Sequence, residues 1–246
     1  MGIMDRFAAK HRFFASPSAF ADGEVQLSEE ESRHASKVLR LGPGDRIEVV
    51  DGEGSAHEVE LVDVAPKRVT GRILQTIKDK GEPSNELHLC LAVLHQAARW
   101  ETFLEKAIEL GCTRITPLIT QRSQHGRLKD RRLQNIMISA LKQSERSRLP
   151  QLDEPTALAD VLQEPGETRL ICHEALSDGT TLQKLTTDGL PDGPRRVLIG
   201  PEGGFTEDEV QAARTAGWTP VWLGERRLRA ETAAMLMASV LSQFDR

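Results

Sequence analysis

The sequence has few cysteines, few aromatic residues and no long apolar segment. Its 246 residues include three cysteines, seven Phe, three Trp and no Tyr. No two cysteines have the C-x-x-C spacing, which argues against a disulfide framework and against a zinc knuckle. No apolar run approaches the roughly 20 residues of a membrane-spanning helix, and the first residues lack the apolar core of a secretory signal. We therefore expect a cytoplasmic protein with no metal and no membrane contact.

The chain is acidic overall, but one segment of it is strongly basic. Hydrophobic residues make up 39% of the chain and charged residues 28%, which is ordinary for a globular protein. The formal net charge is −5, yet residues 122–148 contain eight Lys or Arg against two acidic residues. This segment predicts either a polyanion-binding surface or a solvated helix face, and charge alone does not separate the two.

The first part of the chain has the pattern of a small β-barrel with one helix. Ser28 and Glu31 form a capping-box pattern that predicts a helix over residues 29–41. Runs rich in Val and Ile then predict strands, separated by turns that contain Gly or Pro. The predicted strands are residues 46–50, 56–64 and 68–77. The polar segment 78–85 follows and is the best candidate for a linker between two domains.

From residue 86 onward, apolar runs alternate with helical patterns. This alternation predicts an α/β domain with a parallel sheet and helices on both of its faces. The helix predicted over residues 97–110 carries one apolar stripe and ends before Gly111. A capping box at Thr206 and Glu209 predicts the start of another helix, and residues 231–244 predict the last one. The predicted strands are residues 87–94, 114–119, 169–172, 197–199 and 221–223.

A glycine-rich loop follows the strand that ends at Ile199. Gly200, Gly203 and Gly204 lie at the carboxyl end of a strand, where ligands bind in open α/β sheets. The loop lacks the Walker and dinucleotide-binding spacings, and Glu202 adds negative charge where a phosphate would lie. The acidic loop therefore suits a neutral or cationic ligand. The alternative is a tight strand-to-helix turn with no ligand.

A second unusual loop follows the next strand. It bends at Gly224, carries Arg226, Arg227 and Arg229, and enters the final helix at Glu231. A cation at a helix entrance is unfavourable without a partner, because that end of the helix dipole is positive. Two such loops in one sheet predict a shared crevice. The alternative is a set of surface arginines beside an ordinary helix start.

The residues of these loops resemble the C-terminal signature of the ribosomal small-subunit methyltransferase E family, which belongs to the SPOUT superfamily. The signature comprises residues 199–205, 223–224 and 228–233. The resemblance covers nearly the whole chain after residue 10, in the same order. The further matching segments are residues 11–14, His34 with 38–40, 106–111, Pro117 with 122–123, 143–146 and Pro150.

The resemblance implies a two-domain protein that works on RNA. Residues 1–79 would form a PUA-like RNA-binding β-barrel, and residues 80–246 a SPOUT domain whose parallel sheet contains a trefoil knot. The family transfers a methyl group from S-adenosylmethionine to N3 of a uridine in the 16S ribosomal RNA of the small subunit, and its members are homodimers. Because the sulfonium is already activated, the reaction requires no metal.

The resemblance also implies site residues. S-adenosylmethionine would bind to Ile199, Gly200, Pro201, Glu202, Gly203, Gly204, Leu223, Gly224 and Leu228. For catalysis we predict Arg229, which would stabilise the negative charge that develops on uracil, together with Glu231 and Thr232. The general base stays open, with Glu202 as the other candidate. For phosphate contacts we predict Arg12, Lys37, Arg40, Arg122, Arg146 and Arg148.

Three positions depart from the family pattern. Gln96 and Lys142 lie where Lys and Glu are common, which would weaken contacts to RNA or between subunits, and Glu225 lies where Pro is common. These departures keep one alternative open, a non-catalytic RNA-binding protein with the same fold. A second alternative is a SPOUT enzyme that acts on transfer RNA or on a ribose 2′-hydroxyl group.

Overall fold

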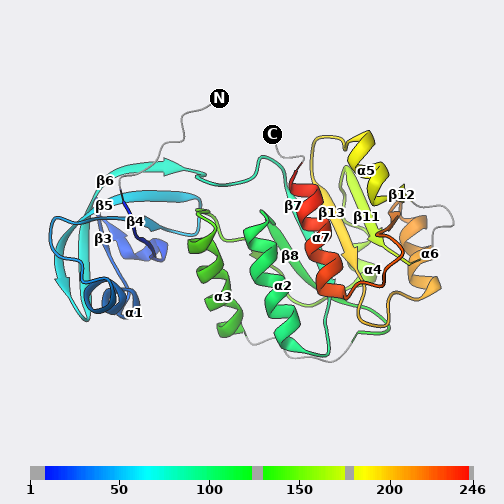
Figure 1. The fold of residues 1–246 in the computed structure, drawn as a ribbon, viewed down its shortest axis with the longest axis horizontal. Helices are drawn as coiled ribbons and strands as arrows, with labels where there is room; N and C mark the ends of the chain where they lie inside the picture. Colours follow the sequence, from blue (N-terminus) through cyan, green and yellow to red (C-terminus); the bar gives the residue numbers. More distant parts are fainter. Residues whose placement is uncertain (1–8, 124–129, 175–179, 244–246) are drawn as a thin grey trace. The chain divides into compact units, whose positions relative to one another are not determined.

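The computed structural model describes residues 9–123, 130–174 and 180–243 (Figure 1). The chain divides into two compact units. Unit 1 comprises Met1–Glu82 and Ile138–Leu149, and unit 2 comprises Pro83–Met137 and Pro150–Arg246. Each unit has its own sheet and its own core. The boundary between residues 79 and 80 stays a prediction, and the inclusion of residues 138–149 in unit 1 was not anticipated.

Unit 1 is built on a six-stranded, mainly antiparallel sheet. Its strands are β1 (Arg12–Phe14), β2 (Phe20–Ala21), β3 (Glu24–Gln26), β4 (Arg46–Val50), β5 (Ser55–Ala65) and β6 (Arg68–Lys78). The strand order is β1-β4-β5-β6-β3-β2, and β1 pairs with β4 in parallel. The three predicted strands correspond to β4, β5 and β6, so the all-β pattern is confirmed, whereas the short β1, β2 and β3 were missed.

The predicted helix of unit 1 is shorter and less regular than expected. The Ser28 hydroxyl accepts a hydrogen bond from the Glu31 amide, and α1 spans Glu29–Arg33. A π-helical turn over His34–Val38 then replaces the rest of the predicted helix, and Arg40 has a φ of 56°. A short 3-10 turn, Pro17–Ala19, precedes β2.

Residues 138–149 join unit 1 through buried contacts. Leu141 packs with Val50 and Ala56 in a small apolar cluster. The Lys142 ammonium lies 2.6 Å from the Glu31 carboxylate, so the departure at Lys142 has a structural partner. The segment 78–85, predicted as a linker, is bound as well, because the Glu82 carboxylate accepts hydrogen bonds from the Ser147 and Arg148 amides.

Unit 2 contains an eight-stranded sheet in which every pairing is parallel, as predicted. The strand order is β10-β8-β7-β13-β11-β14-β12, with β9 beside β8. The strands are β7 (Leu87–Ala92), β8 (Arg114–Ile119), β9 (Gln151–Leu152), β10 (Thr156–Ala157), β11 (Thr168–Cys172), β12 (Thr180–Thr181), β13 (Arg195–Ile199) and β14 (Thr219–Trp222).

The helices of unit 2 are α2 (Ala97–Glu109), α4 (Leu158–Val161), α5 (Leu182–Asp188), α6 (Glu207–Thr215) and α7 (Ala230–Ser242). Helix α3 (Asp130–Gln143) begins in unit 2, and its residues from Ile138 onward belong to unit 1. Residues of α4 and α6 share an apolar cluster with alternate residues of the strands, such as Ile171 and Leu198. Helices α2 and α7 pack against each other, and α7 also packs on β7 and β13. Within the described residues, no helix combines the length and the apolar character needed to cross a membrane.

Candidate functional site

A cavity of about 540 Å³ lies at the carboxyl end of the sheet of unit 2. It is lined by residues 172–174 after β11, by residues 199–202 and Gly204 after β13, and by residues 222–230 and Ala233 after β14. Because these strands are parallel neighbours, the loops that follow them meet at one edge. The cavity is therefore built by the two loops that the sequence singled out, together with residues 172–174 at the end of β11.

Eight of the nine residues predicted to bind the methyl donor line this cavity: Ile199, Gly200, Pro201, Glu202, Gly204, Leu223, Gly224 and Leu228. The ninth, Gly203, does not line it. The structure thus brings residues separated by about 25 positions in the sequence to one wall. Their part in binding is taken up as a proposal below.

Glycine is favoured at two turns of these loops. A Cβ at Gly200 would lie 3.1 Å from the Phe205 nitrogen and 3.2 Å from the Gly204 carbonyl carbon, because the loop folds back on itself there. Gly224 has a φ of 116°, which side chains other than glycine rarely adopt. Both glycines line the cavity, and with no side chain there a ligand can approach the main chain closely.

The glycine-rich loop ends at a strongly capped helix. The Thr206 hydroxyl accepts a hydrogen bond from the Glu209 amide, and the Glu209 carboxylate accepts one from the Thr206 amide at 2.8 Å, so the predicted capping box is confirmed. The same buried carboxylate also accepts a hydrogen bond from the Gln121 amide at 2.8 Å. Glu209 therefore joins the start of α6 to the loop that follows β8.

Arg122 makes a second connection between these two loops. Its Nη1 donates hydrogen bonds to the Gly203 carbonyl at 2.7 Å and to the Phe205 carbonyl at 3.4 Å. Arg122 was predicted to contact RNA, and the structure places it beside the glycine-rich loop. This contact could not be predicted from local spacing, because it joins residues 81 positions apart.

Of the three predicted catalytic residues, the structure brings one to the cavity. Arg229 lines the cavity, is exposed, and has no ion-pair partner among the described residues. Glu231 is buried in the first turn of α7, outside the cavity, and its Oε2 has no hydrogen-bond partner in the described part of the chain. Thr232 is exposed and lies outside the cavity lining. The roles of all three stay predictions.

Arg99 is a further charged residue of this region that the sequence analysis missed. It lies in the first turn of α2, with Nη1 3.9 Å from the Glu202 carboxylate and Nε 3.7 Å from the Glu231 carboxylate. The His95 amide donates a hydrogen bond to the same Glu202 oxygen at 3.2 Å. One feature of the sequence could have indicated this position. Arg99 lies at the start of the helix that follows β7, and β7 is the strand beside β13. Gln96, one of the departures, is the N-cap residue of α2 and makes no side-chain cap.

Cys172 also lines the cavity, but its chemistry is that of an inert thiol. Burial raises its pKa to about 12, so the thiol stays protonated at neutral pH. His173 follows it, with Nε2 3.9 Å from the Glu207 carboxylate. The cavity therefore offers acidic, cationic and main-chain groups rather than a nucleophile.

The residues predicted to contact RNA from unit 1 fall into two groups. Lys37 and Arg40 are exposed beside the π-helical turn. Arg12 pairs with Glu48 at 3.1 Å and Arg146 pairs with Glu82 at 2.8 Å, and all four side chains are at most 10% exposed. Burial lowers the pKa of Arg12. These contacts support a structural role for Arg12 and Arg146, and their RNA contact stays a prediction.

Arg148 lies between these two groups, because its side chain is partly exposed and also has an ion-pair partner. The Arg148 side chain is half exposed and lies 2.6 Å from the Asp79 carboxylate. Arg127 and Lys129, which contribute to the basic count, lie outside the described residues.

Within the described residues, no group of three or more His, Cys, Asp or Glu side chains could hold a metal ion.

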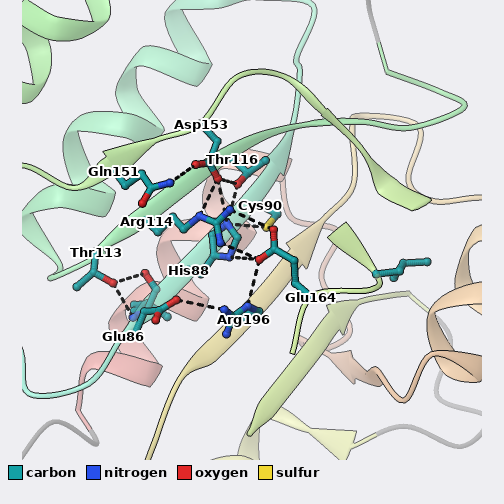
Figure 2. Close-up of polar contacts among 12 residues, drawn as sticks. Glu86, His88, Cys90, Thr113, Arg114, Thr116, Gln151, Asp153, Glu164 and Arg196 are labelled. Atoms are coloured by element: carbon teal, nitrogen blue, oxygen red, sulfur yellow. Dashed lines mark hydrogen bonds and ion pairs between the residues drawn. The ribbon is translucent and has the colours of Figure 1, made fainter. Parts of the chain in front are cut away.

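A different polar cluster lies at the amino end of the same sheet (Figure 2). The Arg114 guanidinium donates hydrogen bonds to the carboxylates of Asp153 and Glu164, both at 2.8 Å. His88 lies among them with no exposed surface, and its Nε2 is 2.7 Å from the Thr116 hydroxyl. Burial, together with Arg114, lowers the pKa of His88 to about 4, so the ring is neutral near pH 7.

Comparison with known proteins relates both units to RNA methyltransferases. A family model described as RNA methyltransferase domain matches residues 81–242, and one described as RNA methyltransferase PUA domain matches residues 27–74. The ribosomal RNA small subunit methyltransferase E of Synechocystis sp. is 31% identical over 232 residues, covering 92% of this chain and 75% of that protein. The protein of the same name from Rickettsia conorii is 27% identical over 227 residues, covering 92% of each chain.

A solved structure gives the same relation in three dimensions. The ribosomal RNA small subunit methyltransferase E of Neisseria gonorrhoeae, bound to S-adenosyl methionine, superposes with a TM-score of 0.81. It is 32% identical, and the match covers 95% of this chain and 97% of that one. Both units are thus related to a solved structure that contains a methyl donor.

Proposed function

This chain belongs to the ribosomal RNA small subunit methyltransferase E family, and from that membership we propose that it methylates N3 of a uridine in 16S ribosomal RNA. It is an S-adenosylmethionine-dependent RNA methyltransferase with an N-terminal PUA-like unit and a parallel-sheet α/β unit. One observation carries the proposal: eight of the nine residues predicted to bind the methyl donor line a single cavity.

The cavity fits S-adenosylmethionine in size and in chemistry. Its volume of about 540 Å³ lies within the range of roughly 300–1,000 Å³ that is usual for small-molecule sites. Its wall carries acidic groups, Glu202 among them, as well as arginines, so the glycine-rich loop places a negative charge where a sulfonium could bind. The close approach of the main chain at Gly200 supports contacts from backbone groups. We propose that residues 199–204 and 223–228 hold the donor.

The chain's own residues have separate tasks in the proposed reaction. When bound, the donor supplies a methyl group on a sulfur that is already an activated leaving group. Arg229, exposed on the cavity wall, would stabilise the negative charge on uracil as its N3 proton leaves. Glu202 lines the same cavity and is held by the His95 amide, so it is the better placed carboxylate to accept that proton. Glu231 is buried and would act by positioning Arg99.

The N3 edge of uracil is engaged in a base-paired duplex, so the target nucleotide has to be unpaired or turned out of its stack. The backbone around it then needs cations. Lys37 and Arg40 on unit 1 are exposed and suit this task. Phosphate contacts of this kind would make RNA affinity fall with added salt.

We further propose that the protein is a cytoplasmic homodimer whose unit 2 contains the trefoil knot of the SPOUT superfamily. Family membership supports all three assignments. The last helix supports the dimer, because Leu236 and Val240 of α7 are apolar and only partly buried within one chain. Light scattering of the purified protein would report the oligomeric state directly.

Mass spectrometry of nucleosides from 16S ribosomal RNA tests the proposed function. Cells that lack the gene should lose 3-methyluridine, and a plasmid copy of the wild-type gene should restore it. Calorimetry with S-adenosylmethionine gives the matching binding measurement. A protein that binds small ribosomal subunits but neither binds the donor nor restores the modified base would be the non-catalytic alternative.

A further inference from the structure

Arg122 joins the loop after β8 to the glycine-rich loop. Its guanidinium donates two hydrogen bonds to main-chain carbonyl groups, those of Gly203 and Phe205. The aliphatic part of the side chain also packs there, because a Cβ on Gly203 would lie 3.3 Å from the Arg122 Cδ. These two carbonyls flank Gly204, which lines the cavity. The position of this stretch of the cavity wall therefore depends on a side chain that lies outside the cavity.

The segment that carries Arg122 is itself held in place. The Thr120 amide donates to the Ser123 hydroxyl at 2.9 Å, which closes a turn around Arg122. The Gln121 amide donates to the buried Glu209 carboxylate at 2.8 Å. The loop after β8 thus donates both a main-chain and a side-chain hydrogen bond across this connection, which is more than the contact of one flexible side chain.

Most of the donors of Arg122 are left for another partner. A guanidinium has five N–H groups, and both bonds to the glycine-rich loop come from Nη1. Among the described residues, Nε and Nη2 make no hydrogen bond and the side chain has no ion-pair partner. The side chain is exposed. Its free edge has the geometry that binds two oxygens of one phosphate.

We propose that Arg122 is a positioning residue with two partners: Nη1 holds the glycine-rich loop, while the free edge binds a backbone phosphate of the RNA substrate. RNA binding and donor binding then favour each other, because a phosphate fixes the guanidinium that fixes the cavity wall. This inference rests on the proposed function. Linkage requires the effect to be reciprocal, so the donor must raise RNA affinity by the same factor.

The first measurement is donor affinity without RNA, by calorimetry with S-adenosylmethionine on the full chain. Arg122→Ala should weaken binding about tenfold, since it removes two hydrogen bonds from a charged donor. Arg122→Lys should fall between, because the lysine ammonium keeps the charge but lacks the fixed planar geometry of the guanidinium. Arg131→Ala is the matched control: Arg131 is exposed, carries the same charge and lies nearby in the sequence, so donor affinity should not change.

The second measurement repeats the titration with small ribosomal subunits from cells that lack the gene. The wild-type protein should bind the donor several-fold more tightly than without subunits, and so should Arg131→Ala. Arg122→Ala should lose this gain. Equal gains in Arg122→Ala and in the wild type would overturn the proposal.

The two proposals fail differently. If the wild-type protein does not bind the donor at all, the proposed function is wrong. If the wild type binds and both Arg122 variants match it without RNA, the function stands and the positioning role is wrong. Thermal unfolding of each variant guards against a folding defect, and Arg122→Lys, which keeps the charge and most of the volume, decides the matter if Arg122→Ala does not fold.

Discussion

The two ends of the sheet in unit 2 both gather charged residues, but they treat them in opposite ways. At the amino end, Arg114, Asp153 and Glu164 are at most 25% exposed and bound to one another (Figure 2). At the carboxyl end, Glu202 and Arg229 are exposed on the wall of a cavity. A cluster of charges therefore does not identify a functional site. Charges on the wall of a cavity are the ones for which we propose a functional role.

The amino-end cluster is arranged for stability. Arg114 is the first residue of β8, His88 the second of β7 and Arg196 the second of β13, so three neighbouring strands contribute. Glu164 lies between the two arginines, 2.8 Å from Arg114 and 3.4 Å from Arg196. Buried charges are costly unless they are paired, and each partner here depends on the others.

Breaking the amino-end cluster should give the largest effect. Arg114→Ala removes hydrogen bonds to two carboxylates. We expect a loss of about 2–3 kcal/mol in the free energy of unfolding, below the value for a fully buried pair because these side chains are partly exposed. Urea denaturation measures it, with Arg33→Ala as control, since the Arg33–Glu29 pair is exposed and should contribute under about 0.5 kcal/mol. Donor affinity of the folded variant should be unchanged, and a loss of affinity without a loss of stability would reverse the comparison.

Removing Arg229, a cation on the cavity wall, should have the opposite effect to removing Arg114: activity should fall and stability should stay the same. Arg229→Ala should lower kcat about 100-fold, the typical cost of removing one group that stabilises developing charge. Stability and donor affinity should hardly change, because Arg229 is exposed and makes no ion pair among the described residues. Single-turnover methylation of small ribosomal subunits gives the rate. Unchanged turnover would remove Arg229 from the mechanism.

His88 predicts a pH dependence that belongs to the amino end alone. Its pKa is about 4 in the folded protein and about 6.5 in an unfolded chain, so between these values the unfolded state binds more protons. Stability should thus be nearly complete above pH 6.5 and fall by about 3 kcal/mol as the pH drops to 4. In the His88→Gln variant, the free energy of unfolding from urea denaturation should fall less than in the wild type over the same pH range. If stability falls equally steeply with pH in the variant and in the wild type, groups other than His88 cause the pH dependence.

Much of unit 2 could be predicted from the sequence. Its strands, the apolar stripe of α2 and the unusual loops all follow from the local spacing of residues. Predicted strand 114–119 coincides with β8, and the predicted stripe is the buried face of α2. The glycine-rich loop was found because its composition is unusual wherever it lies. Local patterns also misled: the helix predicted over residues 29–41 gives way to a π-helical turn after Arg33.

The sequence could not show which group each charged side chain binds in the folded protein. Arg146 looked like an RNA contact, but in the structure Glu82, 64 positions away, binds it in a buried pair. Arg122 looked the same and holds the glycine-rich loop. Spacing along the chain shows where a cation stands and carries no information on which distant carboxylate or carbonyl group the fold brings to it.

Arg99 sharpens the comparison, because it is a cation at the carboxyl end that lies between two carboxylates, as Arg114 does at the amino end. If its pairing serves the chemistry, Arg99→Ala should lower kcat about tenfold while donor affinity changes little, since Glu202 would keep its place on the cavity wall but lose the cation that orients it. Arg99→Lys should recover most of the rate. Lys106→Ala, on the exposed side of the same helix, is the control and should match the wild type. If Arg99→Ala instead loses stability and keeps its rate, then paired charges serve the fold at both ends of the sheet, and the carboxyl end differs by its exposed arginines, such as Arg229, that make no ion pair among the described residues.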